Sequence, residues 1–137
     1  DLEGRMARTN KSRIQAFLID FSQRLTKGDG QGIADKFALP AFVAGDDMAL
    51  PLTEKEQIAK FFGQGPEQYN KMGIVDTRPE IDQIEPLTGK LFSVDVRWPY
   101  VYADGHETAG ESSRYLLQLD GDDVRIRAVT MRGVQEA

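Results

Sequence analysis

The sequence predicts an α+β fold in which a bent antiparallel sheet wraps around three N-terminal helices. Two observations lead to this prediction. Apolar residues recur at helical spacing in the first half of the chain, whereas every second residue is apolar in three runs of the last third. Period-two runs joined by short Asp/Gly turns are typical of half-buried antiparallel strands. The helices must then cover the apolar face of the sheet.

The first predicted helix follows residues 1–9, which we expect to form a flexible tail. Its expected cap is Asn10 or Ser12, and Gly28-Asp29-Gly30 ends it. The offsets between its apolar residues place them on one stripe, which consists of Ile14, Phe17, Leu18, Phe21 and Leu25. A short second helix is predicted over residues 32–39, stopped by Pro40.

A small hairpin and a third helix are predicted next. Residues 42–43 and 48–50 flank a turn at residues 45–47. Thr53 and Glu56 form a capping box, and the following helix carries Ile58, Phe61 and Phe62 on one face. Pro66 can begin a further helical turn, which carries Tyr69 and Met72. The remaining segments, 74–85, 91–103, 106–119 and 124–132, are predicted as strands.

The turns between the long strands predict which residues oppose one another. A two-residue turn at Asp104-Gly105 places Trp98 opposite Glu111 and Tyr100 opposite Ala109. A second turn over residues 120–123 places Tyr115 beside Ala128, Ser113 beside Thr130 and Glu111 beside Arg132. A β-bulge in these strands would shift part of this map by one residue.

Polar groups gather at one end of the otherwise apolar inner face, and this end is the predicted functional site. Glu111 is the candidate catalytic acid or base, because a carboxyl group beside an indole is desolvated and its pKa is expected to rise. The candidate ligand-binding residues are Trp98, Tyr100, Ser113, Tyr115 and Thr130. The alternatives are that Glu111 pairs with Arg132 at the rim and that the aromatic residues belong to the core.

Three other polar features have structural explanations that we favour. Asp95 falls opposite Arg114 on the outer face, as a cross-strand ion pair or else an anchor for an acidic ligand. His106 is expected to be exposed in a turn. Asp46-Asp47 is expected to be a turn, because two carboxylates without further oxygen ligands are a weak cation signal.

Apolar residues interrupt the charges of the predicted outer face, which predicts a homodimer formed across that face. These residues are Leu91, Val101, Leu116, Val129 and Met131.

Length, charge and composition limit the kinds of protein and partner that this sequence is compatible with. The 137 residues suit one domain, assigned to residues 10–133, and the net charge of −5 argues against nucleic-acid and anionic-membrane partners. The chain has no cysteine and a single histidine, so we expect no disulfide, no metal site and no cofactor. No apolar run is long enough for a membrane helix, and the cytoplasm is the expected location.

The order of elements and several stretches resemble the nuclear transport factor 2-like superfamily, and within it the SnoaL-like group. The stretches are residues 17–21, 34–40, 94–98, 103–105, 113–117 and 124–127, and the resemblance spans about residues 11–132. The sequence most resembles uncharacterised bacterial members of that group. The resemblance implies a cystatin-like cone, a scaffold that hosts isomerases, cyclases, hydrolases, dehydratases and non-catalytic modules.

The catalytic patterns of these relatives are not reproduced here. Ketosteroid isomerase-like members carry a base where this chain has Val43-Ala44-Gly45, with Asp46 and Asp47 just beyond, so the base is missing or displaced. The His and Asp pair of cyclase-like members would need His106 inside the cone, and Asp95-Val96-Arg97 reverses the Arg-x-Asp order of epoxide hydrolase-like members. From the polar end of the apolar inner face we expect a protein that binds, or transforms, a small and partly apolar ligand. The alternative is a dimeric accessory or assembly module with a filled interior.

Overall fold

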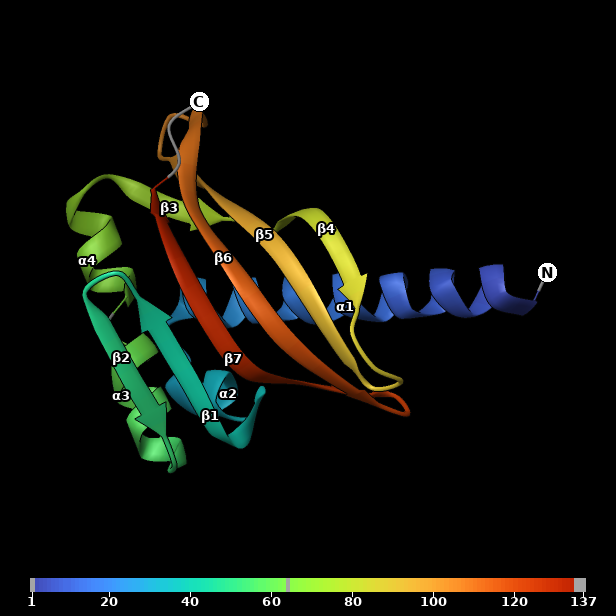
Figure 1. The fold of residues 1–137 in the computed structure, drawn as a ribbon. Helices are drawn as coiled ribbons and strands as arrows, with labels where there is room; N and C mark the ends of the chain where they lie inside the picture. Colours follow the sequence, from blue (N-terminus) through green and yellow to red (C-terminus); the bar gives the residue numbers. More distant parts are fainter. Residues whose placement is uncertain (1, 64, 135–137) are drawn as a thin grey trace.

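The structure of the protein is a computed structural model that describes residues 2–63 and 65–134. In chain order the elements are α1 (Leu2–Lys27), α2 (Gly30–Ala34), β1 (Phe37–Gly45), β2 (Met48–Leu52), α3 (Lys55–Gly63), α4 (Gly65–Lys71), β3 (Ile74–Thr77), β4 (Glu80–Pro86), β5 (Leu91–Tyr102), β6 (Glu107–Asp120) and β7 (Asp123–Val134). The strands form one curved sheet in the order β2-β1-β7-β6-β5-β3, and β4 also pairs with β5. The helices lie on one face of this sheet (Figure 1). The predicted α+β fold is confirmed, although β1 pairs with β7 in parallel and the sheet is therefore mixed.

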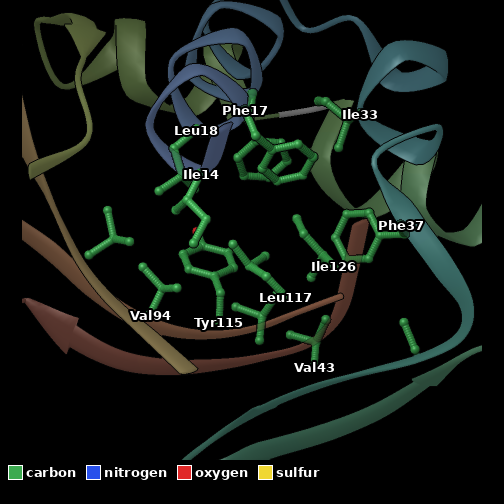
Figure 2. Packing of buried hydrophobic residues seen from close by; sticks show 14 of the residues in the cluster. Ile14, Phe17, Leu18, Ile33, Phe37, Val43, Val94, Tyr115, Leu117 and Ile126 are labelled. Atoms are coloured by element: carbon green, nitrogen blue, oxygen red, sulfur yellow. The ribbon is translucent and has the colours of Figure 1, made fainter. Parts of the chain in front are cut away.

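The long helix α1 crosses the concave face of the sheet with its predicted stripe inward. Ile14, Phe17, Leu18 and Phe21 are buried, and Figure 2 shows the first three above strand residues of the core. The helix begins at Leu2, so the predicted start at Asn10 or Ser12 is wrong. The predicted tail, residues 1–9, is therefore helical from Leu2, and its flexibility stays a prediction.

The predicted second helix is the largest error in secondary structure. Helix α2 ends at Ala34, and residues 37–39 belong to strand β1. Helix α2 begins where the Asp29 side chain accepts a hydrogen bond from the backbone N–H of Gly32 at 3.1 Å. Phe37, Ala41 and Val43 of β1 are buried. Phe37 and Val43 pair with β7 and Ala41 pairs with Leu52 of β2, and this tertiary pairing outweighs the local helical pattern.

Helix α3 has the predicted kind of cap with a different partner. The backbone N–H groups of Thr53 and Glu54 donate to Gln57 Oε1 at 2.8 and 3.0 Å. Because the helix begins at Lys55, Gln57 rather than Glu56 occupies the third helical position. Ile58 is fully buried, but Phe61 is 39% exposed, so the helix face predicted to hold both is not buried along its whole length.

The pairing of β5 with β6 departs from the predicted register twice, and the two one-residue shifts cancel each other. The turn holds three residues rather than two, because the Tyr102 N–H donates to His106 O at 2.9 Å. Tyr100 therefore pairs with Thr108 instead of Ala109. A bulge at Gly110 then restores the predicted register, and Trp98 lies opposite Glu111 as expected. A Cβ on Gly110 would lie 1.7 Å from Trp98 O, so this position requires glycine.

A bulge at Arg127 changes which side chains of β7 face inward. Leu117 pairs with Ile126 as predicted, but Leu116 pairs with Ala128, so Arg127 has no partner across the strand pair. Beyond the bulge the register predicted for Ser113, Tyr115 and Glu111 is wrong by one residue or more. Their observed partners are Met131, Val129 and Val134.

The shifted register corrects two assignments. Val129 is buried and Met131 packs against the core, so neither belongs to the outer face on which the sequence placed them. Thr130 is exposed and does not face the interior.

The outer face carries the predicted ion pair. Arg114 Nε lies 2.7 Å from Asp95 Oδ1, and this guanidinium holds the pKa of Asp95 below its ordinary value.

Within the described residues, no helix combines the length and hydropathy needed to cross a bilayer.

Phe21 lies at the centre of the core. Its ring contacts the rings of Phe37, Phe62, Trp98 and Tyr115 edge-on, with centroids 6.1–6.4 Å apart. These partners come from β1, α3, β5 and β6, so one side chain of α1 joins four other elements.

Phe21→Ala should lower the free energy of unfolding by about 3–5 kcal/mol, because it leaves a cavity that the surrounding rings cannot fill. Phe61→Ala is the matched control and should cost clearly less, since Phe61 is already 39% exposed. Urea unfolding of both variants measures the difference. Equal losses would contradict the central position of Phe21.

Candidate functional site

A cavity of about 430 Å³ lies beside the C-terminal end of α1, between this helix, α3, α4 and the sheet, whose edge strand β3 forms part of the wall. Most of its wall is aromatic or aliphatic. The lining residues are Phe21, Leu25, Thr26, Phe61, Phe62, Pro66, Gln68, Tyr69, Asn70, Ile74, Val75, Asp76, Thr77, Trp98, Tyr100, Glu111, Tyr115 and Met131. A largely apolar cavity with a few polar groups has the character of a small-molecule site.

Glu111 is the polar centre of this cavity. The hydroxyl of Tyr100 donates to Glu111 Oε1 at 2.8 Å, and the hydroxyl of Tyr69 donates to the same oxygen at 3.2 Å. The three side chains come from β6, β5 and α4, and the two phenol rings lie 5.8 Å apart. The second carboxylate oxygen, Oε2, accepts no hydrogen bond from the described part of the chain.

The electrostatics keep the protons on the two phenols. Burial raises the pKa of Tyr69 to about 12, and the negative charge of Glu111 adds to this shift. Burial and the hydrogen bond to Glu111 also raise the pKa of Tyr100. Both phenols are therefore neutral donors at neutral pH, and Glu111 is their acceptor.

A second polar pair lies deeper, at the boundary with the core. Trp98 Nε1 donates to the hydroxyl of Tyr115 at 3.1 Å, and both side chains are buried. Burial raises the pKa of the Tyr115 phenol, whereas the hydrogen bonds with Trp98 and Ser113 oppose that shift. This pair satisfies the polar atoms of two large side chains and leaves their ring surfaces to the cavity.

An exposed carboxylate, Asp76, lines the cavity on the side of β3. Its Oδ1 accepts hydrogen bonds from the hydroxyl of Thr26 at 3.2 Å and from the backbone N–H of Thr77 at 2.9 Å. These contacts connect α1 to β3 and fix the carboxylate at the cavity wall.

The structure brings together four of the six residues that the sequence proposed for the site. Trp98, Tyr100, Glu111 and Tyr115 all line the cavity. Ser113 is buried beside Tyr115 without lining the cavity, and Thr130 is exposed on the other side of the sheet.

The alternative partner for Glu111 is not supported. Val134 rather than Arg132 pairs with Glu111, and the Arg132 guanidinium lies 3.8 Å from Asp95 on the outer face.

Sequence reasoning missed several lining residues, among them Tyr69, Met131 and Asp76. Tyr69 lies on α4, a separate helix whose approach to Glu111 follows from tertiary packing alone. Met131 enters the cavity because of the bulge at Arg127, which no local pattern marks. Asp76 lies in an edge strand between Val75 and Thr77, and no local pattern marks it as a cavity residue.

The remaining polar features have structural roles. His106 is exposed, contacts Asp104 through Nδ1 and stacks on Tyr102 at 4.4 Å. Asp46 and Asp47 form the exposed turn between β1 and β2. Across the described ranges, no cluster of three or more His, Cys, Asp or Glu side chains is placed to hold a metal ion.

Comparison with known families shows to which family this chain belongs. The family model described as NTF2-like protein (DUF6841) matches residues 10–134, and the chain belongs to that family. A search of curated proteins finds no match.

Solved structures share the fold at low sequence identity. A cystatin-like domain of unknown function from Nostoc punctiforme is 17% identical, with a TM-score of 0.70 over 93% of this chain and 78% of that chain. Aln2 from a Streptomyces species is 16% identical, with a TM-score of 0.70 over 91% of each chain. An NTF2-like protein from Novosphingobium aromaticivorans is 12% identical, with a TM-score of 0.68 over 100% of this chain and 92% of that chain. These similarities establish the NTF2/cystatin-like fold.

Glu111→Gln should lower the pKa of Tyr69 from about 12, because loss of the negative charge makes the phenolate less unfavourable. The pKa should stay above the ordinary value of 10.0, since burial is the larger cause of the shift. A pH titration of isotope-labelled tyrosine by NMR measures it. Asp122→Asn, in the turn between β6 and β7, removes the same charge elsewhere and should leave Tyr69 unchanged. A Tyr69 pKa unaffected by Glu111→Gln would mean that the two groups do not interact.

Proposed function

We propose that this NTF2-like protein binds a small, largely apolar molecule in the cavity, with Glu111 as its main polar contact. The observation that carries the proposal is the cavity itself, about 430 Å³ in volume and walled by aromatic side chains. Protein interiors are otherwise close-packed, and an open volume of this size leaves apolar surface without contacts. A ligand with ring systems of similar shape would supply those contacts.

The position of Glu111 supports a binding role over a purely structural one. Placing a carboxylate against an apolar wall is costly unless partners compensate for the lost hydration. Here Tyr69 and Tyr100 compensate at Oε1, while Oε2 remains available to a hydrogen-bond donor. A ligand hydroxyl, amide or amine could donate to Oε2.

The same arrangement supports Glu111 as an acid or base. Two phenols fix the carboxylate in one orientation, which is what proton transfer to or from a bound molecule requires. Trp98, Tyr100 and Tyr115 then shape the pocket, and Ser113 supports the Tyr115 hydroxyl. Thr130 has no part in this proposal because it lies on the outer face.

The alternative function is an accessory or assembly module whose own side chains fill the interior. The cavity favours binding over this alternative. We also retain the closer relationship to the SnoaL-like group as a proposal, supported by the stretches of residues 94–98 and 113–117 that resemble it.

We further propose that the protein is a homodimer formed through the outer face of the sheet. An apolar row crosses four strands there: Phe42 pairs with Pro51 and Ala128, and Ala128 pairs with Leu116. Phe42 is 45% exposed. The adjacent Asp95 and Arg114 carry opposite charges, which suits a surface that meets its own copy across a two-fold axis.

N-phenyl-1-naphthylamine, an uncharged apolar dye, should gain fluorescence on binding to the wild-type protein. Leu25→Trp should remove most of this gain, because the larger side chain occupies the cavity that Leu25 lines. The control is Leu87→Trp, at an exposed position outside the cavity lining, which should bind the dye as the wild type does. No gain in the wild type, or an equal gain in Leu25→Trp, would favour the filled accessory module.

Sedimentation velocity at micromolar concentration should show a species of twice the 15.3 kDa mass of one chain. Phe42→Asp should shift it towards the single chain, because the substitution places charge in the apolar row. Met72→Asp changes a residue that is 62% exposed on another part of the surface and should leave the dimer intact. A wild type that sediments only as a single chain would exclude the proposed assembly.

A further inference from the structure

The cavity wall carries negative charge without a compensating cation. Glu111 and Asp76 both line the cavity, and no Lys, Arg or His does so among the described residues. The nearby Arg78 is engaged elsewhere, since its guanidinium lies 2.8 Å from both Glu80 and Glu107. A molecule entering the cavity therefore meets two carboxylates and no positive side chain from the described part of the chain.

The aromatic walls add to the same preference. Tyr69 and Tyr100 have ring centroids 5.8 Å apart and planes inclined by 46°, so they form two walls at an angle beside Glu111. The face of an aromatic ring attracts a cation. Both phenols also donate to a carboxylate, which polarises them and increases the negative charge of the ring system.

We propose that the cavity selects an organic cation, an aromatic or otherwise apolar body that carries a protonated amine. The ammonium group would lie at Glu111, beside rather than between the rings of Tyr69 and Tyr100, and the apolar body would contact Trp98 and Phe21. Asp76, which is exposed, would attract the same charge during entry. This inference rests on the proposed function and adds the charge of the ligand to it.

The other charge classes fit the cavity less well. An anion would be placed beside Glu111, where the phenol hydroxyls already donate to the carboxylate and no cation from the described residues lines the wall. A neutral molecule would gain the apolar contacts but not the attraction of the two carboxylates. The net charge of −5 on the whole chain adds a long-range attraction for cations.

Three indole compounds of similar size separate these classes. Tryptamine is a cation at neutral pH, tryptophol is neutral and indole-3-propionate is an anion. Isothermal titration calorimetry at low salt should show tryptamine binding about tenfold more tightly than tryptophol, as expected for a partly desolvated cation among rings and carboxylates. Indole-3-propionate should bind most weakly.

Two variants test the origin of the preference. Glu111→Gln should reduce the preference for tryptamine over tryptophol from about tenfold to about twofold, because the amide keeps the shape and removes the charge. Asp122→Asn changes the net charge equally at an exposed turn outside the cavity lining and should keep the full preference. Circular dichroism confirms that both variants fold.

The outcomes distinguish this inference from the proposed function. If tryptophol or indole-3-propionate binds as tightly as tryptamine, or if Glu111→Gln keeps the full preference, charge selection is excluded while ligand binding stands. If none of the three indoles binds but the wild type still binds N-phenyl-1-naphthylamine, charge selection is again excluded and ligand binding is retained. If neither the indoles nor the dye binds, both proposals are excluded.

Discussion

The contact between the apolar stripe of α1 and the curved sheet is the constraint on which the rest of the structure depends. Phe21 is its central residue, because the ring reaches β1, α3, β5 and β6 at once. On one side of Phe21 the interior is filled by Ile14 and Leu18. On the other side Phe21 forms part of the cavity wall. One helix therefore both closes the core and leaves the volume that a ligand would occupy.

The bulges of the sheet decide which side chains reach that volume. Gly110 allows β6 to pass close to Trp98, and the extra residue on β7 at Arg127 turns Met131 inward and Thr130 outward. A bulge bends the strand that contains it and increases the local twist. The curvature that encloses the cavity and the composition of its wall thus have the same cause.

Charge is distributed differently on the two faces of the sheet. On the outer face Asp95 is paired with Arg114, so these charges mostly offset each other. In the cavity the hydrogen-bond partners of Glu111 are the neutral phenols of Tyr69 and Tyr100. Neutral donors stabilise a carboxylate without cancelling its field, which leaves the cavity negative. That difference is the physical basis for the two proposals, ligand binding in the cavity and self-association through the outer face.

The sequence by itself determined the fold class, the inward stripe of α1 and the placement of Trp98 opposite Glu111, because these follow from local periodicity and from turns between neighbouring strands. The pairing of Trp98 with Glu111 was predicted correctly because the extra turn residue and the bulge at Gly110 shift the register in opposite directions. Tertiary structure alone decided the strand from Phe37 onward, the inward position of Met131 and the contact of Tyr69 with Glu111. A strand whose partner is distant in sequence, a bulge without a local signal and the packing of a separate helix all depend on contacts between segments that no single window contains.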